Sequence, residues 1–287
     1  MSKLQSPVLV PTRSRRHWGS RILKALCWVA GGLTFGILAL IVIYILVRGV
    51  PYLTPSLFAW TYTSDNVSMT HAIINTLTMT ALSLLFSVPV GVGGGIYLAE
   101  YAKPGSKLVK VIRVTAETLA GIPSIIYGLF GMLAFVVTMK MSNSLLAGAL
   151  TLAIMTLPLI LRQTEESLLS VPLSYREGSF GLGAGKLRTT VRIVLPVATP
   201  GILAAVILSI GRIAGETAAL IYTSGTVARV ASNLFASGRT LAVHLFQLQQ
   251  EGMHINEAFA VAVVLLVIVV MMNALSAWIA GKLTRKG

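Results

Sequence analysis

Long apolar runs separated by short polar segments divide the chain into six stretches, each long enough to cross a lipid bilayer. A membrane-spanning helix needs about 20 mainly apolar residues. The pattern therefore predicts an all-α integral membrane protein with six transmembrane helices, the fourth of them short, at about residues 24–47, 72–99, 118–138, 145–161, 197–225 and 257–281.

The composition agrees with this prediction. Of the 287 residues, 55% are hydrophobic and 11% are charged, and the mean hydropathy is +0.82. A soluble domain of this length is less apolar and carries more charge.

The basic residues indicate a topology rather than a nucleic-acid partner, although the formal net charge is +14. If the N-terminus is cytoplasmic, 18 Lys and Arg residues lie on the cytoplasmic side. Only four lie outside: Arg48, Lys140, Arg229 and Arg239. Cytoplasmic loops of membrane proteins carry such an excess of positive charge. We therefore expect both termini in the cytoplasm.

Proline and glycine interrupt two of the predicted spans. Pro89 removes a backbone donor and would kink the second span. The glycines beside it would let a neighbouring backbone approach closely: Gly91, Gly93, Gly94 and Gly95. Pro123, two residues after Gly121, breaks the helix ladder of the third span, which is tolerated where the freed carbonyls face protein or water. We assign Pro89, Gly121 and Pro123 to packing or gating.

Two opposite charges lie within the fifth predicted span, in the run Arg212-Ile-Ala-Gly-Glu216-Thr217. In a continuous helix, Arg212 and Glu216 share one face. Burying either charge alone costs at least ~2.5–3.5 kcal/mol, and such residues usually face a bundle interior or an aqueous cavity. The pair is either a structural ion pair or part of an anion pathway. In the second case Arg212 binds the anion, because a guanidinium suits phosphate oxygens.

The polar loop between the fourth and fifth spans contains a spaced motif. Glu177 is followed by Gly178 and Ser179, and then by Gly183. Three further anchors come at fixed offsets: Ile193, Leu195 and Pro196. This pattern resembles the cytoplasmic EAA loop of binding-protein-dependent (type I) ABC importer permeases, E-A-A-x3-G-x9-I-x-L-P, with Gly178 and Ser179 in place of the two alanines.

The resemblance implies that the loop, at about residues 173–196, couples the permease to a separate ATPase. Gly183 would let the chain turn between two short helices, and Glu177 would offer a carboxylate to the partner. Apolar side chains on this polar loop would enter a groove of the partner: Leu173, Tyr175, Phe180, Leu182 and Leu187. A helix lying on the membrane surface is the alternative, but it does not explain the spaced anchors.

Other candidate sites are weak. The run Gly181 to Lys186 looks like a phosphate-binding loop, but Phe180 stands where the first glycine is required and Leu187 where Ser or Thr is required. We expect no nucleotide site and no cofactor in this chain. His71, His244 and His254 lack partners at metal-ligand spacing, so we expect solvated or interfacial histidines and no metal site. Amphipathic turns are expected near Asn233–Ser237 and Thr240–Gln250.

A second resemblance narrows the family. The third span reads Gly-Ile-Pro-Ser-Ile-Ile-Tyr-Gly-Leu-Phe-Gly from Gly121, and the fifth contains Arg-Ile-Ala-Gly-Glu-Thr from Arg212. Both runs are similar to those of the phosphate-specific (Pst) permeases, PstA-type. The resemblance implies a phosphate pathway with Arg212, Glu216 and Thr217. It also implies a second permease (PstC-like), two ATPase subunits (PstB-like) that carry ATP and Mg, an external binding protein (PstS-like), and a plasma (inner) membrane location.

The domain organisation follows from these assignments. We expect a cytoplasmic arm, first span and outer loop over residues 1–70, a permease core over 71–281 and a basic tail over 282–287. Phosphonate, sulfate or molybdate permeases remain alternatives. An ion-coupled secondary transporter would have several intramembrane carboxylates and inverted repeats, whereas only Glu216 is clearly of that kind. An intramembrane enzyme is weaker still, because the spans contain no catalytic constellation.

Overall fold

The computed structural model describes residues 18–103 and 105–284, and all regular structure within them is helical. The all-α prediction is thereby confirmed for this part of the chain. In chain order the elements are α1 (Trp18–Gly49), η1 (Val50–Tyr52), η2 (Pro55–Phe58), α2 (Thr70–Ile96), η3 (Tyr97–Tyr101), α3 (Lys107–Ala120), α4 (Ser124–Gly131), η4 (Met132–Thr138), α5 (Leu145–Leu169), α6 (Leu173–Gly181), α7 (Lys186–Thr189), η5 (Thr190–Val194), α8 (Leu195–Ala214), α9 (Ala218–Thr223), α10 (Leu241–Glu251) and α11 (Ile255–Thr284).

The chain divides into two compact units, residues 1–46 and 47–287. Most of α1 belongs to the first unit, and its apolar side chains are exposed all round, as Trp28 and Phe35 show at 74% and 76%. A helix that is apolar on every side needs a surrounding protein core or lipid. Its length and composition allow it to cross a membrane.

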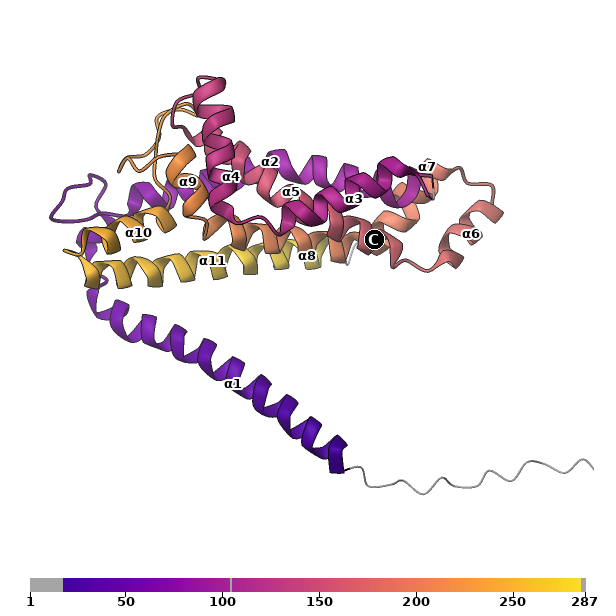
Figure 1. Ribbon diagram of the computed structural model, residues 1–287, viewed down its shortest axis with the longest axis horizontal. Helices are drawn as coiled ribbons and strands as arrows, with labels where there is room; N and C mark the ends of the chain where they lie inside the picture. Colours follow the sequence, from indigo (N-terminus) through magenta and orange to yellow (C-terminus); the bar gives the residue numbers. More distant parts are fainter. Residues whose placement is uncertain (1–17, 104, 285–287) are drawn as a thin grey trace, which may run out of the picture. The chain divides into compact units, whose positions relative to one another are not determined.

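The second unit is built on α2, α5 and α8, which lie side by side, with α11 along α8 (Figure 1). Glycine makes the closest of these contacts possible. A Cβ on Gly91 would lie 2.8 Å from Cγ2 of Ile160, and one on Gly95 would lie 2.6 Å from Cβ of Thr164. The predicted close approach is therefore confirmed at these two glycines, whereas Gly93 faces open space.

Five helices are long and apolar enough to span a membrane, and the bent pair α3–α4 makes a sixth candidate. The third predicted span is not one straight helix. Only its first residues belong to α3, which already begins at Lys107, and α3 meets the segment from Ser124 to Thr138 at 105°. Gly121 caps α3, and Pro123 is the N-cap of α4. The break at Pro123 is thus confirmed, because proline offers no N–H to the preceding turn. By contrast, α2 continues as one helix through Pro89.

The fifth predicted span also differs from a single helix. Helix α8 ends at Ala214, and α9 begins only at Ala218. Gly215 caps α8, and glycine commonly marks the end of a helix because its backbone is permissive. The segment predicted as one span over 197–225 therefore contains a break at residues 215–217.

Candidate functional site: paired helix breaks and the EAA-type loop

The two helix breaks lie close together, because α4 packs against α9. A Cβ on Gly128 of α4 would lie 2.8 Å from Cα of Ala219 in α9, so the two backbones are in direct contact. Interrupted membrane helices expose backbone groups and helix ends that transport proteins use to bind cargo. We call residues 121–123 and 215–217 the paired breaks.

The paired breaks change the predicted relation between Arg212 and Glu216. Glu216 lies beyond the end of α8, so the prediction that the two share one helix face is wrong. Its carboxylate Oε1 instead accepts a hydrogen bond from the N–H of Ala219, 3.2 Å away, in the first turn of α9. A carboxylate is favourable there, because the first N–H groups of a helix lack partners within it.

Arg212 is half-buried in the last turn of α8. Within residues 18–103 and 105–284, no hydrogen bond or ion pair engages its guanidinium. Its positive charge interacts electrostatically with Tyr127 of α4, whose hydroxyl donates a 2.8 Å hydrogen bond to the carbonyl of Leu119 across the first break. The structural ion pair with Glu216 is therefore absent, and a cation remains available beside the paired breaks.

Thr217, the third predicted pathway residue, lies at the second break and lines a groove of about 440 Å³. The other lining residues are mainly apolar and come from α4, α9 and α10: Ile125, Ala218, Ile221, Tyr222, Ala242, Leu245, Phe246 and Gln249. Arg212 and Glu216 do not line this groove. The structure thus brings the three residues to one break without arranging them around one cavity.

The EAA-type loop, residues 173–196, folds as two short helices with a turn between them. Helix α6 ends at Gly181, and α7 begins at Lys186. Gly183 has φ +81°, a left-handed conformation that glycine adopts without strain. The predicted turn is confirmed. Gly178 on α6 faces open space, and Pro196 lies in the first turn of α8 after Ile193 and Leu195.

The side chains of this loop separate into an exposed set and an internal set. Glu177 is exposed and has no partner in the described residues. The predicted apolar set is exposed as well, at 64%, 50%, 47%, 91% and 68% for Leu173, Tyr175, Phe180, Leu182 and Leu187. Ser179 is buried, and its hydroxyl lies 2.8 Å from that of Thr189 in α7. Ser179 therefore joins the two short helices and is not part of the exposed surface.

Sequence reasoning missed an ion pair at the base of this loop. The Arg176 guanidinium contacts Oε1 of Glu100 through Nη2 at 2.6 Å and Nε at 3.2 Å. It also donates to the carbonyls of Leu168 and Val171 at 2.9 and 2.8 Å. Both charged side chains are largely buried, at 14% and 8% exposure. The two residues are 76 positions apart in the sequence, so no local pattern indicates the pair. Only the isolated acid at the end of the second span could have indicated it.

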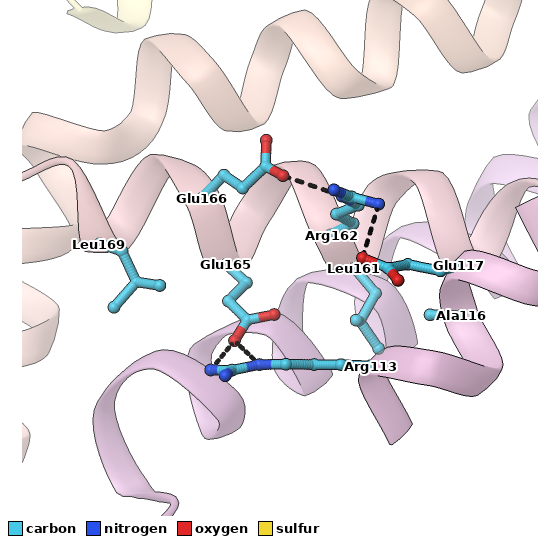
Figure 2. Close-up of a pocket in the computed structure, with 8 residues that line it drawn as sticks. All are labelled: Arg113, Ala116, Glu117, Leu161, Arg162, Glu165, Glu166 and Leu169. Carbon is cyan, nitrogen blue, oxygen red and sulfur yellow. Dashed lines mark hydrogen bonds and ion pairs between the residues drawn. The ribbon is translucent and has the colours of Figure 1, made fainter. Parts of the chain in front are cut away.

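A second group of charges joins α3 to α5 (Figure 2). Arg113 of α3 contacts Glu165 of α5 through Nη2 and Nε, at 2.5 and 2.8 Å. Arg162 of α5 reaches back to Glu117 of α3 at 3.1 Å and also contacts Glu166 at 2.9 Å. These residues border a pocket of about 190 Å³. Two ion pairs thus connect α3, the helix before the first break, to α5: in one the arginine is on α3, and in the other it is on α5.

The histidines differ from the sequence expectation. His71 and His244 are 2% and 0% exposed, not solvated or interfacial. They form a cluster with Tyr62 and Arg239, in which Nε of Arg239 donates to Nε2 of His71 at 3.3 Å and the guanidinium lies 4.6 Å from the centre of the Tyr62 ring. Helix α10 carries His244 and lies where the second turn was expected. At the first, the N–H of Ala236 donates to the carbonyl of Asn233 at 3.1 Å, so residues 233–236 form a turn that is not continued as a helix.

The remaining histidines are less buried or outside the structure. His254 is half-buried, 3.8 Å from Glu257. His17 lies outside the described residues. Among the described residues, no group of three or more His, Cys, Asp or Glu side chains could hold a metal ion.

Comparison with known proteins identifies relatives of the whole second unit. Residues 91–286 match the family described as "Binding-protein-dependent transport system inner membrane component". The chain is 33% identical over 281 residues to the "Probable ABC transporter permease protein YqgI" of Bacillus subtilis, covering 89% of this chain and 94% of that one. It is 32% identical over 219 residues to the "Phosphate transport system permease protein PstA 1" of Mycobacterium tuberculosis, covering 75% and 71%.

The fold agrees with these matches. A chain of a bacterial alginate ABC transporter, solved in complex with its pentasaccharide-bound periplasmic protein, superposes with a TM-score of 0.65 at 16% identity. The superposition covers 92% of this chain and 97% of that one. At this identity the likeness concerns the fold alone, and it confirms the predicted importer-permease architecture.

Proposed function

Because the chain belongs to the family of binding-protein-dependent transport system inner membrane components, we propose that it is a permease subunit of an ATP-driven importer of inorganic phosphate. Members of this family are multi-pass inner-membrane subunits of bacterial ABC importers. They have no nucleotide site and no cofactor, since ATP is bound by the ATPase partner. The phosphate assignment and the roles of individual residues are our proposal.

The observation that carries the assignment to an oxyanion cargo is the Arg212 guanidinium beside the paired breaks. It is half-buried and has no partner within the described residues. A guanidinium binds phosphate oxygens through two parallel hydrogen bonds. The relatives named as phosphate transport system permeases add support, at 32% identity for PstA 1. Arg212 would bind the anion, while Glu216 keeps the second break in place through its contact with Ala219.

The EAA-type loop supplies the proposed connection to ATP hydrolysis. Exposed apolar residues on α6 and its turn would enter a groove of the ATPase, and the exposed carboxylate of Glu177 would meet a basic group there. Importers of this family work with ATPase subunits and an external binding protein. For this chain we propose two PstB-like ATPases, a PstC-like second permease and a PstS-like binding protein.

Transport would proceed by alternating access at the paired breaks. The ends of α3, α4, α8 and α9 meet there, so a small displacement of one half-helix changes which backbone groups face the pathway. The Arg212 charge would compensate the negative charge of phosphate in a region where unpaired charges are costly. Phosphonate, sulfate and molybdate remain chemically possible cargoes, because a guanidinium binds any of these oxyanions.

The cargo can be tested by the ATPase activity of the complex. The complex that co-purifies with this chain is placed in lipid nanodiscs with its binding protein, and ADP release is measured with phosphate, sulfate, molybdate or methylphosphonate. In the samples without added phosphate, an enzymatic scavenger removes the phosphate that hydrolysis releases. We expect several-fold stimulation by phosphate alone. Equal or greater stimulation by another oxyanion would reject the phosphate assignment while leaving the importer class in place.

A further inference from the structure

The inner end of α2 is the point where the EAA-type loop joins the helical core. Helix α2 continues into the π-helical turn η3 (Tyr97–Tyr101), and single π-helical turns are frequent at functional sites. We propose that Glu100 of η3 is the receiver for movements of the loop and that Arg176 is the positioning residue that transmits them. This inference rests on the proposed coupling function of the loop.

The contacts of Arg176 hold α6 against the ends of two other helices. Its guanidinium contacts the Glu100 carboxylate of η3 and the carbonyls of Leu168 and Val171 around the end of α5. One side chain on α6 therefore fixes its position relative to both α2 and α5. Because the guanidinium is planar and its donors are fixed in direction, a displacement of α6 must move these acceptors or break the bonds.

Apolar packing does not provide an equivalent link for α6. In the described residues, the hydrophobic core clusters take no member from Leu173–Gly181. An open cavity of about 600 Å³ lies between α6 and the core, and Glu100, Arg176, Phe180 and Lys186 are among its lining residues. The polar contacts of Arg176 therefore lie in the wall of an open cavity and not in an apolar core.

A second contact ties the other half of the loop to the same turn. The Lys186 ammonium at the start of α7 lies 5.2 Å from the centre of the Tyr101 ring, within the range of a cation–π interaction. Ser179 and Thr189 join α6 to α7 through their hydroxyls. Both helices of the loop are thus connected to η3. Among the described residues, only Arg176 makes this connection by a largely buried ion pair.

The inference predicts that α6 and α2 move as one body when the ATPase binds ATP. Spin labels are attached at Ser174→Cys on α6, which is exposed and outside the apolar set, and at Leu85→Cys on α2, 65% exposed. The exposed Cys27 is first changed to Ser. The distance between the labels is measured by electron paramagnetic resonance in the co-purified complex, without nucleotide and with a non-hydrolysable ATP analogue. This readout requires no cargo.

In the otherwise native chain we expect one narrow distance distribution that is the same in both states. With Arg176→Gln or Glu100→Gln we expect it to broaden and to change on ATP binding, while ATP hydrolysis continues with at least a tenfold lower ratio of transport to hydrolysis. Arg192→Gln removes a positive charge from the same loop at an exposed position and should leave both readouts unchanged.

Three results would overturn the inference: an ATP-dependent change of the label distance in the native chain, a normal transport-to-hydrolysis ratio in Glu100→Gln, or the same defect in Arg192→Gln. If Arg176→Gln fails to assemble, the native chain and Glu100→Gln still test the inference. Glu100→Gln is expected to assemble, because Arg176 keeps its hydrogen bonds to the carbonyls of Leu168 and Val171. Lack of phosphate transport by the native complex would reject the proposed cargo and would not affect the label distances.

Discussion

Arg212 has an isolated positive charge in a region that is otherwise strongly apolar. The guanidinium is half-buried without a hydrogen-bond partner in the described part of the chain, and a charge at the centre of a membrane helix costs at least ~2.5–3.5 kcal/mol. A purely structural arginine would be expected to have a carboxylate partner. The nearby Glu216 instead contacts the backbone of α9, which favours a role for Arg212 in binding cargo.

We predict that Arg212→Gln abolishes phosphate uptake while the amount of permease and its association with the ATPase stay near normal. Arg212→Lys should keep part of the activity, because the charge remains without the two-pronged geometry. The variants are compared by uptake of radioactive phosphate and by co-purification of the ATPase.

The double variant Arg212→Gln, Glu216→Gln separates the two roles. Since the two side chains form no ion pair in the structure, neutralising Glu216 should not restore uptake. Recovery of uptake in the double variant would show that Arg212 had served to balance Glu216 and would remove the anion-binding role.

Burial of His244 makes the stability of the fold sensitive to acid. Desolvation, helped by the positive charge of Arg239, lowers the pKa of His244 to about 3, whereas an unfolded chain has a histidine pKa of about 6.5. The unfolded state therefore binds the proton first. The resulting stability is fully present above pH 6.5 and is lost as the pH falls towards 3, by about 1.4 kcal/mol per pH unit.

We accordingly expect the detergent-purified protein to unfold at a lower denaturant concentration at pH 5 than at pH 7. His244→Gln should reduce this difference, because the amide does not titrate. His254→Gln, which changes a half-buried histidine on the other side of Gly252, serves as the control. A pH dependence equal in all three proteins would contradict the assignment to His244.

Glycine determines how closely α2 and α5 pack. A methyl group at Gly95 would lie 2.6 Å from Cβ of Thr164 and 2.9 Å from the carbonyl oxygen of Leu161, whereas one at Gly93 would meet nothing within 4 Å. We predict that Gly95→Ala lowers the free energy of unfolding by about 1–3 kcal/mol. Gly93→Ala should be neutral or stabilising by up to about 1 kcal/mol. The thermal unfolding midpoints of the two variants are compared. Equal midpoints would contradict the close contact at Gly95.

We propose that the EAA-type loop contacts the ATPase through its exposed surface. Glu177→Arg reverses the exposed charge, and Gly183→Asp places a side chain where φ is +81°, which strains the turn. Each variant should remain in the membrane but lose co-purification of the ATPase or uncouple hydrolysis from uptake. Normal assembly and normal uptake in both would show that another surface performs the coupling.

The sequence predicted elements best where one local signal decides the conformation. Pro123 indicated the break between α3 and α4, and Gly183 indicated the turn of the loop. The break after Ala214 was not predicted, because the apolar residues on both sides of Arg212 and Glu216 were joined into one long span, and hydropathy does not register a capped helix end. The Arg176–Glu100 and Arg113–Glu165 pairs could not be predicted either, because they join residues 76 and 52 positions apart.

At the scale of the molecule, the excess of positive charge on alternate loops predicts how the chain lies in the membrane. A cysteine label at position 188 in α7 should react only from the cytoplasmic side, and one at Asp65 only from outside. Cys27→Ser provides the background for both. The two positions are labelled with a membrane-impermeant reagent, and their reactivity in intact cells is compared with that in inverted vesicles. Labelling of position 188 in intact cells would overturn the predicted orientation.

The central claim is that this permease admits phosphate in an ATP-driven cycle. The most direct test is uptake of radioactive phosphate by proteoliposomes that contain the co-purified complex, with binding protein outside and ATP inside. The account predicts that phosphate accumulates only with hydrolysable ATP and that an excess of unlabelled sulfate or molybdate does not compete. Accumulation of another oxyanion in place of phosphate, or phosphate entry that is independent of ATP, would contradict it.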